Sequence, residues 1–280
     1  MLKNILVPLT DSARDNDALS AAIKLAQGYD AQVRAVEICD LHPPLDGPWD
    51  LIPAQAITAA EAAVRSQASG RAEKVRGHVA KHAAHVSVEV WEANTDSPAA
   101  LAAYLAQAAD ICVLPAWAGT AKPAPRLKRF FSAVLFQSGT PILLVPSRSK
   151  HPLPPECALV AWNGSANARR ALTGALPLLQ RAKQVHFVEV DPPLEGLRAD
   201  EALREALIGY LKQHRIEATF TTSSSKVNSC SDVVLAHARK VGAQLLVMGG
   251  YGHSRLREWS LGGMTRDVLA GGSLPLLVAH

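Results

Sequence analysis

Four glycines near the C-terminus are the residues of this sequence whose spacing best fits binding chemistry. They lie in the segment VMGGYGHSRLREWSLGGMTRDVL (247–269), at positions Gly249, Gly252, Gly262 and Gly263. A buried strand is predicted to end at Met248, and a helix is predicted to begin after Gly263. A glycine-rich loop that leads into a helix N-terminus presents backbone N–H groups to an anion. The segment therefore predicts a phosphate-binding loop. The alternative, in which the glycines serve only tight turns, is less favoured because they stand at both ends of one loop.

Residues for covalent or metal chemistry are not assembled elsewhere in the sequence. Ser165, in WNGSAN, is predicted to be a helix N-cap because the G-x-S-x-G pattern of a nucleophilic serine is absent. His82 and His85 are spaced like a metal pair, but no third ligand completes a site. His253 and Arg255 either reach the phosphates of a ligand or lie on the surface, and both interpretations stay open. No catalytic residue and no metal site is predicted, and any turnover is expected to be slow.

The chain repeats itself, and the repeat places the glycine loop in a larger architecture. Residues 5–19 (ILVPLTDSARDNDAL) align with residues 158–172 (ALVAWNGSANARRAL) at a constant offset of 153 positions. Two later segments of each half match at an offset of 134 positions, 109–119 with 243–253 and 141–146 with 275–280. The repeat predicts two homologous domains, 1–148 and 153–280, joined by the proline-rich segment SRSKHPLPP (147–155).

Each half alternates short apolar runs with stretches rich in alanine and leucine. In the first half the apolar runs predict the strands NILVPL, QVRAVEI, VSVEVW, DICVLP and PILLVP. Helices are predicted over 16–28, with Gly28 at the C-terminal end, over 97–109, with Ser97 as N-cap, and from about Ser231. Strands that alternate with helices predict an α/β fold, with a five-stranded parallel sheet between helical layers in each half. Ligands of such sheets bind beyond the carboxyl ends of the strands.

Composition and charge fit a globular protein and exclude several classes. Hydrophobic residues make up 48% of the 280 residues and charged residues 19%, which excludes wholesale disorder. A formal net charge of +4 does not predict a specific nucleic-acid binder. The sequence shows neither a signal peptide nor a run of about 18 apolar residues, so no membrane partner and a cytoplasmic location are expected. Four widely spaced cysteines predict free thiols.

The first half lacks the glycine pattern of the second. Pro115 and Ala118 align with Gly249 and Gly252. Because proline has no N–H donor and side chains obstruct close backbone approach, the first half is not expected to bind the same ligand. Its loop TAKPAPRLKRFF (120–131) is predicted to be either an anion- or partner-binding patch or a solvated face whose phenylalanines turn inward.

The spacing Gly249-xx-Gly252-x9-Gly262 resembles the nucleotide-binding signature of the universal stress protein family. The openings VPLTDS and VAWNGS resemble that family's first strand and turn. The resemblance covers essentially the whole chain, as a tandem of two such domains. It implies that each half is a Rossmann-like, three-layer domain of the adenine nucleotide alpha hydrolase-like type. It also implies ATP as a ligand of the C-terminal domain alone, and leaves Mg²⁺ open as its companion.

The resemblance also implies roles for individual residues. Ala161 and Asn163 would meet the adenine and ribose, and Val190 would pack on the base. The ribose and phosphates would be met by the strand end and glycine loop, at Met248, Gly249, Gly252, His253, Gly262, Gly263, Met264 and Thr265. Two positions depart from the family pattern. Asn163 replaces an aspartate, and Gly263 replaces a residue with a hydroxyl or amide side chain. Thr265 could supply a substitute hydroxyl. Each net hydrogen bond to the ligand that is lost would weaken ATP binding by about 1 kcal/mol.

These features predict a nucleotide-binding regulator of the stress response rather than a fast enzyme. The alternative is a scaffold or interaction protein that binds no nucleotide and keeps the glycine loop for its shape. Members of the family pair through their last strands, and the runs 141–146 and 275–280 are the corresponding edges in this chain. The chain is therefore expected to form an intramolecular pseudo-dimer, and a homodimer of whole chains stays open.

Overall fold

The computed structural model describes most of the chain, namely residues 1–41, 53–82, 85–94, 96–117, 125–191, 197–225, 229–250, 267–268 and 273–280. Over 197–200 it describes the backbone alone. The elements of the first half are β1 (Asn4–Pro8), α1 (Asp15–Tyr29), β2 (Gln32–Asp40), α2 (Ala54–Val79), the 3₁₀ turn η2 (Ala80–His82), β3 (Val86–Ala93), α3 (Pro98–Ala106), β4 (Ile111–Pro115), α4 (Pro125–Gln137) and β5 (Ile142–Val145). Those of the second half are β6 (Cys157–Ala161), α5 (Ala166–Leu179), β7 (Gln184–Val190), α6 (Leu197–Gln213), β8 (Ala218–Ser223), α7 (Cys230–Val241), β9 (Leu245–Gly249) and β10 (Leu276–Ala279).

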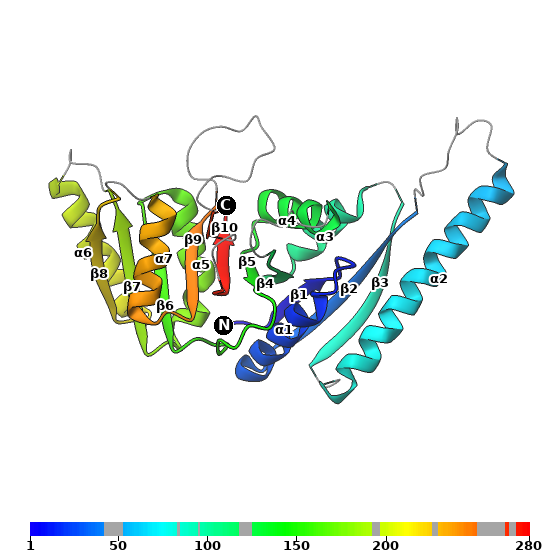
Figure 1. Cartoon of the computed structure of the whole chain (residues 1–280), viewed down its shortest axis with the longest axis horizontal. Coiled ribbons are helices and arrows are strands. Elements are labelled where there is room, and N and C mark those ends of the chain that lie inside the picture. The colour runs from blue at the N-terminus through cyan, green and yellow to red at the C-terminus, as the bar shows by residue number, and fades with distance from the viewer. Residues whose placement is uncertain are drawn as a thin grey trace.

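One ten-stranded sheet runs through both halves, in the order β3-β2-β1-β4-β5-β10-β9-β6-β7-β8 (Figure 1). Within each half the five strands are parallel, as the alternating pattern predicts. At the centre β5 and β10 pair antiparallel, with Leu277 opposite Leu143. The predicted pairing of the last strands is therefore confirmed, and each strand covers the other's exposed edge.

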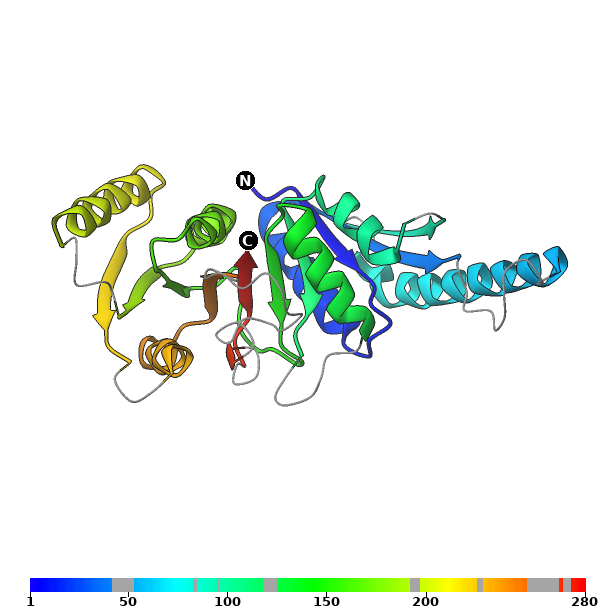
Figure 2. The same ribbon diagram turned by 90° about the horizontal axis from the view of Figure 1, so that it is seen from above.

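Helices cover both faces of this sheet, and each face has its own hydrophobic core. Alternate residues of a strand point to opposite faces, so Ile5 of β1 joins one core and Leu6 the other. The first core lies under α1, α2, α5 and α6, and the second lies under α3, α4 and α7. Figure 2 shows this layering in the second half, where α5 and α6 lie on one side of the strands and α7 on the other. Both cores continue from β5 into β10, so the halves share them.

The predicted N-cap Ser97 is confirmed, but two predicted helix ends are wrong, because α3 ends at Ala106 rather than at 109 and α1 does not end at Gly28. The Ser97 hydroxyl accepts a hydrogen bond from the Ala100 N–H and caps α3, as predicted. The prediction that the first helix ends at Gly28 is wrong, because α1 continues to Tyr29 and Asp30 adopts the left-handed conformation, with φ 51°. Gly28 has a different role. A Cβ there would lie 3.2 Å from the Pro154 ring, so the glycine lets the segment between the halves pass close to α1.

Side-chain contacts reinforce the junction of the halves. The Tyr29 hydroxyl of α1 donates to the Pro177 carbonyl of α5 at 2.7 Å, and the Arg181 guanidinium lies 4.3 Å from the centre of the Tyr29 ring. Burial raises the pKa of Tyr29 to about 12, so the hydroxyl remains a donor at neutral pH. No helix among the described residues is long and apolar enough to cross a membrane.

We expect the two halves to unfold as one unit, because both cores cross the β5–β10 junction. Replacing the fully buried Leu277 by alanine should lower the free energy of unfolding by about 2–5 kcal/mol. Calorimetry should show a single transition that moves to lower temperature as a whole. The matched control is Leu203→Ala, at a side chain that is 50% exposed on α6, which should change stability by less than about 1 kcal/mol. Two separate transitions, of which only one responds to Leu277→Ala, would contradict a shared core.

Candidate functional site

A cleft in the second half brings together five of the residues predicted to bind a ligand: Ala161, Asn163, Val190, Met248 and Gly249. It lies at the carboxyl ends of β6, β7 and β9 and beside the N-terminus of α7. The cleft encloses about 400 Å³ of space, part of which is open to solvent. The other predicted residues lie outside the described part of the chain, namely Gly252, His253, Gly262, Gly263, Met264 and Thr265.

The walls of the cleft are apolar. Val188 and Val190 come from β7, Met248 from β9 and Val234 from α7. Val188, Val234 and Met248 are buried, and Val190 is half-buried. Apolar walls with a few polar groups at the rim are the usual surroundings of a flat, partly hydrophobic ligand.

Asn163 organises the turn that leads from β6 into α5. Its Oδ1 atom accepts hydrogen bonds from the Ser165 N–H at 3.2 Å and the Ser165 hydroxyl at 2.7 Å. The Ser165 hydroxyl oxygen in turn accepts from the Ala168 N–H at 3.1 Å, which confirms Ser165 as the N-cap of α5. Gly164 between them has φ +69°, in the left-handed region that favours glycine. Among the described residues nothing accepts from Nδ2 of Asn163, so this amide remains able to donate to a ligand.

The first residues of the glycine loop are held by close packing. A Cβ on Gly249 would lie 2.5 Å from the Ala168 nitrogen, so the N-terminus of α5 rests directly on this strand end. The Gly250 N–H donates to the Ala279 carbonyl at 2.8 Å. A Cβ on Gly250 would lie 2.9 Å from Val278 and 3.6 Å from Leu135. Leu135 belongs to α4, so the first half supports the point where the loop leaves the sheet.

Sequence reasoning missed Asn167, which fixes the same strand exit. Its side chain is buried, with its Nδ2 donating to the Gly250 carbonyl at 2.7 Å and its Oδ1 accepting from the Arg170 guanidinium at 3.0 Å. The sequence could have identified Asn167 only as a second amide residue, four positions after Asn163. It does not show that this side chain points into the protein.

A thiol, Cys230, lines the cleft, and an acid, Asp191, directly follows the wall residue Val190. Both carboxylate oxygens of Asp191, the residue after β7, accept hydrogen bonds from Ser224 or Ser225. These bonds, chiefly those from Ser225, lower the pKa of Asp191. Cys230 lines the cleft at the start of α7, and desolvation together with the nearby Asp191 charge raises the pKa of its thiol. The thiol is therefore protonated at neutral pH, which makes it a poor nucleophile.

In the first half, arginine side chains lie at the corresponding strand end. By the repeat, Ile38 in QVRAVEI corresponds to Val190 in QVHFVEV. The Arg126 guanidinium donates to the Ile38 carbonyl at 2.7 Å and lies 3.4 Å from the fully buried Glu37 carboxylate. Arg71 of α2 donates to the same Glu37 oxygen at 2.7 Å. An arginine thus covers the strand end that is open in the second half.

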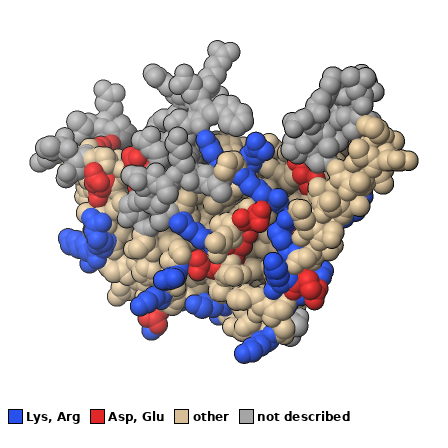
Figure 3. All heavy atoms as spheres, turned by 45° about the vertical axis from the view of Figure 1, so that its right-hand side comes forward, with Lys and Arg blue, Asp and Glu red and all other residues tan. Residues whose placement is uncertain are grey.

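Of residues 120–131, residues 120–124 lie outside the described part of the chain, and residues 125–131 bear on the two interpretations of this segment. From Pro125 onward this segment is helix α4 rather than loop, and Phe130 and Phe131 are buried, as the solvated-face interpretation predicts. Arg126 departs from that interpretation because it turns inward to Glu37. Figure 3 shows basic and acidic side chains interspersed over the coloured part of the face that it presents.

We expect Arg126 to be a structural residue of the first half. Replacing it by methionine removes the hydrogen bond to Ile38 and one cation beside the buried Glu37. The free energy of unfolding should fall by roughly 1.5–3 kcal/mol, the usual range for a hydrogen bond to a charged group. Arg129→Met, at an exposed position of the same helix, is the matched control and should be nearly neutral. Equal stabilities of the two variants in chemical denaturation would show that Arg126 is not held in this way.

Solved structures share this architecture over the whole chain. A universal stress protein from Archaeoglobus fulgidus DSM 4304 superposes with a TM-score of 0.68 at 18% identity, covering 99% of this chain and 97% of that one. A universal stress protein described as putative, from Pseudomonas aeruginosa UCBPP-PA14, gives a TM-score of 0.60 at 16% identity and covers 99% and 93% of the two chains. At these identities the likeness concerns the fold. No curated protein matches the sequence.

The sequence itself carries the family assignment. The sequence model of the universal stress protein family matches the chain twice, over residues 1–114 and 158–280. The two matches fall on the two halves of the sheet and include the strands that form the cleft. The chain therefore belongs to the universal stress protein family, as a tandem of two of its domains.

Proposed function

We propose that the C-terminal half binds an adenine nucleotide, ATP, in the cleft at the ends of β6, β7 and β9, and that its occupancy regulates the chain in the stress response. One observation carries the proposal. Residues from three strands, predicted as ligand contacts from their likeness to nucleotide-binding relatives, line a single cleft.

The residues of the cleft fit the two chemical parts of a nucleoside. The apolar walls, with Val190 among them, suit the faces of the base, and the Nδ2 of Asn163 suits a ribose hydroxyl. The glycine loop begins at this cleft with Gly249 and would supply backbone N–H groups to the phosphates. Asp191 already accepts three hydrogen bonds from Ser224 and Ser225. A Mg²⁺ ion would therefore depend on the nucleotide's own phosphates for most of its ligands.

One feature favours the alternative of a scaffold that binds no nucleotide. The packing of α5 against the strand end explains Gly249 without any ligand, because a side chain there would meet the Ala168 nitrogen. Packing alone would therefore require a glycine at this position, even in a protein that acts through its surface and binds nothing in the cleft. For the same reason Gly249 is a poor position for testing ATP binding, since its substitution would disturb the fold.

The test is calorimetric titration with ATP, with and without Mg²⁺. The wild-type chain should bind one ATP per chain. Val190→Trp should fill the cleft and abolish binding, and Gly252→Val should do so by obstructing the loop. The matched control is Val90→Trp on β3, at a valine that is 37% exposed in the first half, which should leave binding unchanged. An absence of heat at millimolar ATP, or binding that survives Val190→Trp, would favour the scaffold.

A further inference from the structure

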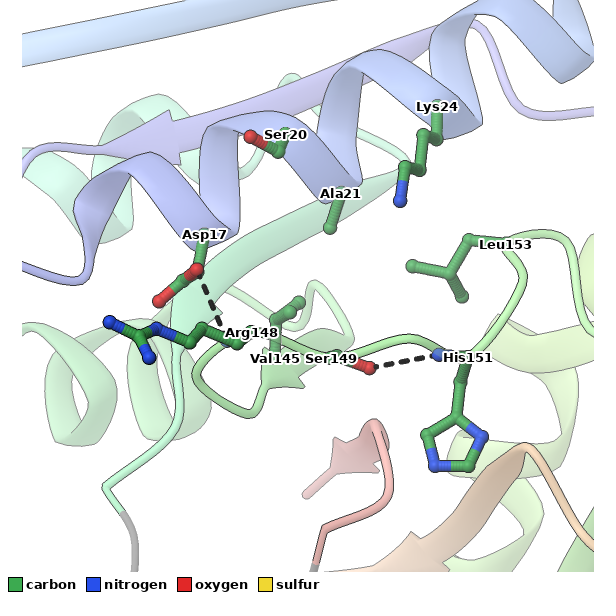
Figure 4. Close-up of a pocket in the computed structure, with 9 residues that line it drawn as sticks. All are labelled: Asp17, Ser20, Ala21, Lys24, Val145, Arg148, Ser149, His151 and Leu153. Atoms are coloured by element: carbon green, nitrogen blue, oxygen red, sulfur yellow. Dashed lines mark hydrogen bonds between the residues drawn. The ribbon is translucent and has the colours of Figure 1, made fainter.

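A second pocket lies in the first half, between α1 and the segment that joins the halves (Figure 4). We call it the linker pocket. It encloses about 340 Å³, part of which is open to solvent, and its lining consists of Asp17, Ser20, Ala21, Lys24, Val145, Arg148, Ser149, His151 and Leu153. Among the described residues, it shares none with the proposed nucleotide cleft.

Two cationic side chains of this pocket have no acidic partner. Among the described residues no carboxylate pairs with the Lys24 ammonium or the Arg148 guanidinium. Figure 4 shows them on opposite sides of the pocket, with Lys24 reaching from α1 toward the linker and Arg148 lying beside Asp17. The Asp17 carboxylate accepts a hydrogen bond from the backbone N–H of Arg148 at 3.2 Å. The carboxylate therefore fixes the turn, and both cationic groups keep their donors available.

The turn that presents Arg148 has an unusual backbone. Arg148 has φ +52°, in the left-handed region that long side chains seldom adopt. The turn is held by the bond to Asp17, by the Ser149 N–H donating to the Pro146 carbonyl at 3.2 Å, and by the His151 N–H donating to the Ser149 hydroxyl at 3.4 Å. Backbone outliers of this kind occur often at ligand sites. In this turn the outlier places an unpaired guanidinium at the rim of a pocket.

Between the two cations the pocket wall is apolar or hydroxyl-bearing, apart from the Asp17 carboxylate beside Arg148. Ala21 and Val145 lie between them in Figure 4. The Ser149 hydroxyl, which accepts from His151, still has its own proton to donate. The imidazole of His151 points away from α1, and burial lowers its pKa, so it adds no charge at neutral pH. The pocket therefore offers one cation at each end and a hydroxyl donor near its middle.

We propose that the linker pocket binds a small ligand with two anionic groups, of the size and charge of pyrophosphate. One anionic group meets Lys24 and the other meets Arg148, with the Ser149 hydroxyl donating between them. A guanidinium and an ammonium are the usual protein partners of phosphate oxygens. Because Lys24 belongs to α1 and Arg148 to the linker, the ligand ties the linker to the first half. The nucleotide cleft plays no part in this binding.

The test is a titration of the isotope-labelled full chain with pyrophosphate, without Mg²⁺ and at constant ionic strength, followed by NMR. The backbone amide signals of Arg148, Ser149 and His151 should shift in a saturable way. Orthophosphate, with a single anionic group, should bind at least tenfold more weakly. Lys24→Ala and Arg148→Asn should each weaken pyrophosphate binding at least tenfold. Asparagine is chosen because it tolerates the left-handed backbone while removing the charge.

Two controls separate this site from general charge and from the nucleotide cleft. Lys81→Ala removes an exposed lysine elsewhere on the first half and should leave binding unchanged. Gly252→Val should also leave pyrophosphate binding unchanged. The experiment therefore tests the linker pocket independently of ATP binding. Spectra that match the wild type away from the pocket will establish that the variants fold. Shifts that are linear in pyrophosphate, that persist in Lys24→Ala, or that disappear in Gly252→Val would overturn the proposal.

Discussion

The antiparallel pairing of β5 with β10 holds the two halves of this chain together. It joins two parallel sheets into one of ten strands and covers an edge that each half would otherwise expose. Because alternate residues of both strands point to opposite faces, the same pairing makes both hydrophobic cores continuous between the halves. It also brings Leu135 of α4 against Gly250, where the glycine loop leaves the sheet. The first half therefore supports the part of the second half that carries the proposed ligand site.

The two halves share a strand order but differ at the place where ligands are expected. In the second half, Ala161, Val190 and Met248 line an open cleft. In the first half, Arg126 covers the carbonyl of Ile38 and approaches the buried Glu37. In the proposed function, one half of the duplicated fold is the binding site and the other half supports it. We infer that the first half contributes through the shared sheet and the linker rather than through a second nucleotide.

The sequence was sufficient for the architecture because strand and helix periodicity, capping serines and an internal repeat all indicate the same fold. It was also sufficient for the residues at strand ends, since parallel strands bring their carboxyl ends to one edge and so place Asn163 near Val190 and Gly249. It was insufficient for side chains whose direction depends on tertiary packing. Arg126 and Asn167 look like solvent-facing polar residues in the sequence, yet one reaches Glu37 and the other reaches Gly250. Nor could it anticipate the linker pocket, which depends on the left-handed turn at Arg148.

The proposed asymmetry, in which one half of this chain carries a nucleotide and the other does not, can be tested directly. The measurement is mass spectrometry of the small molecules released when freshly purified protein is denatured, quantified per chain. We expect one adenine nucleotide per chain, absent from protein that carries Gly252→Val. Two nucleotides per chain would contradict the closure of the first half by Arg126. None, in protein that also fails to take up ATP, would contradict the cleft as a nucleotide site.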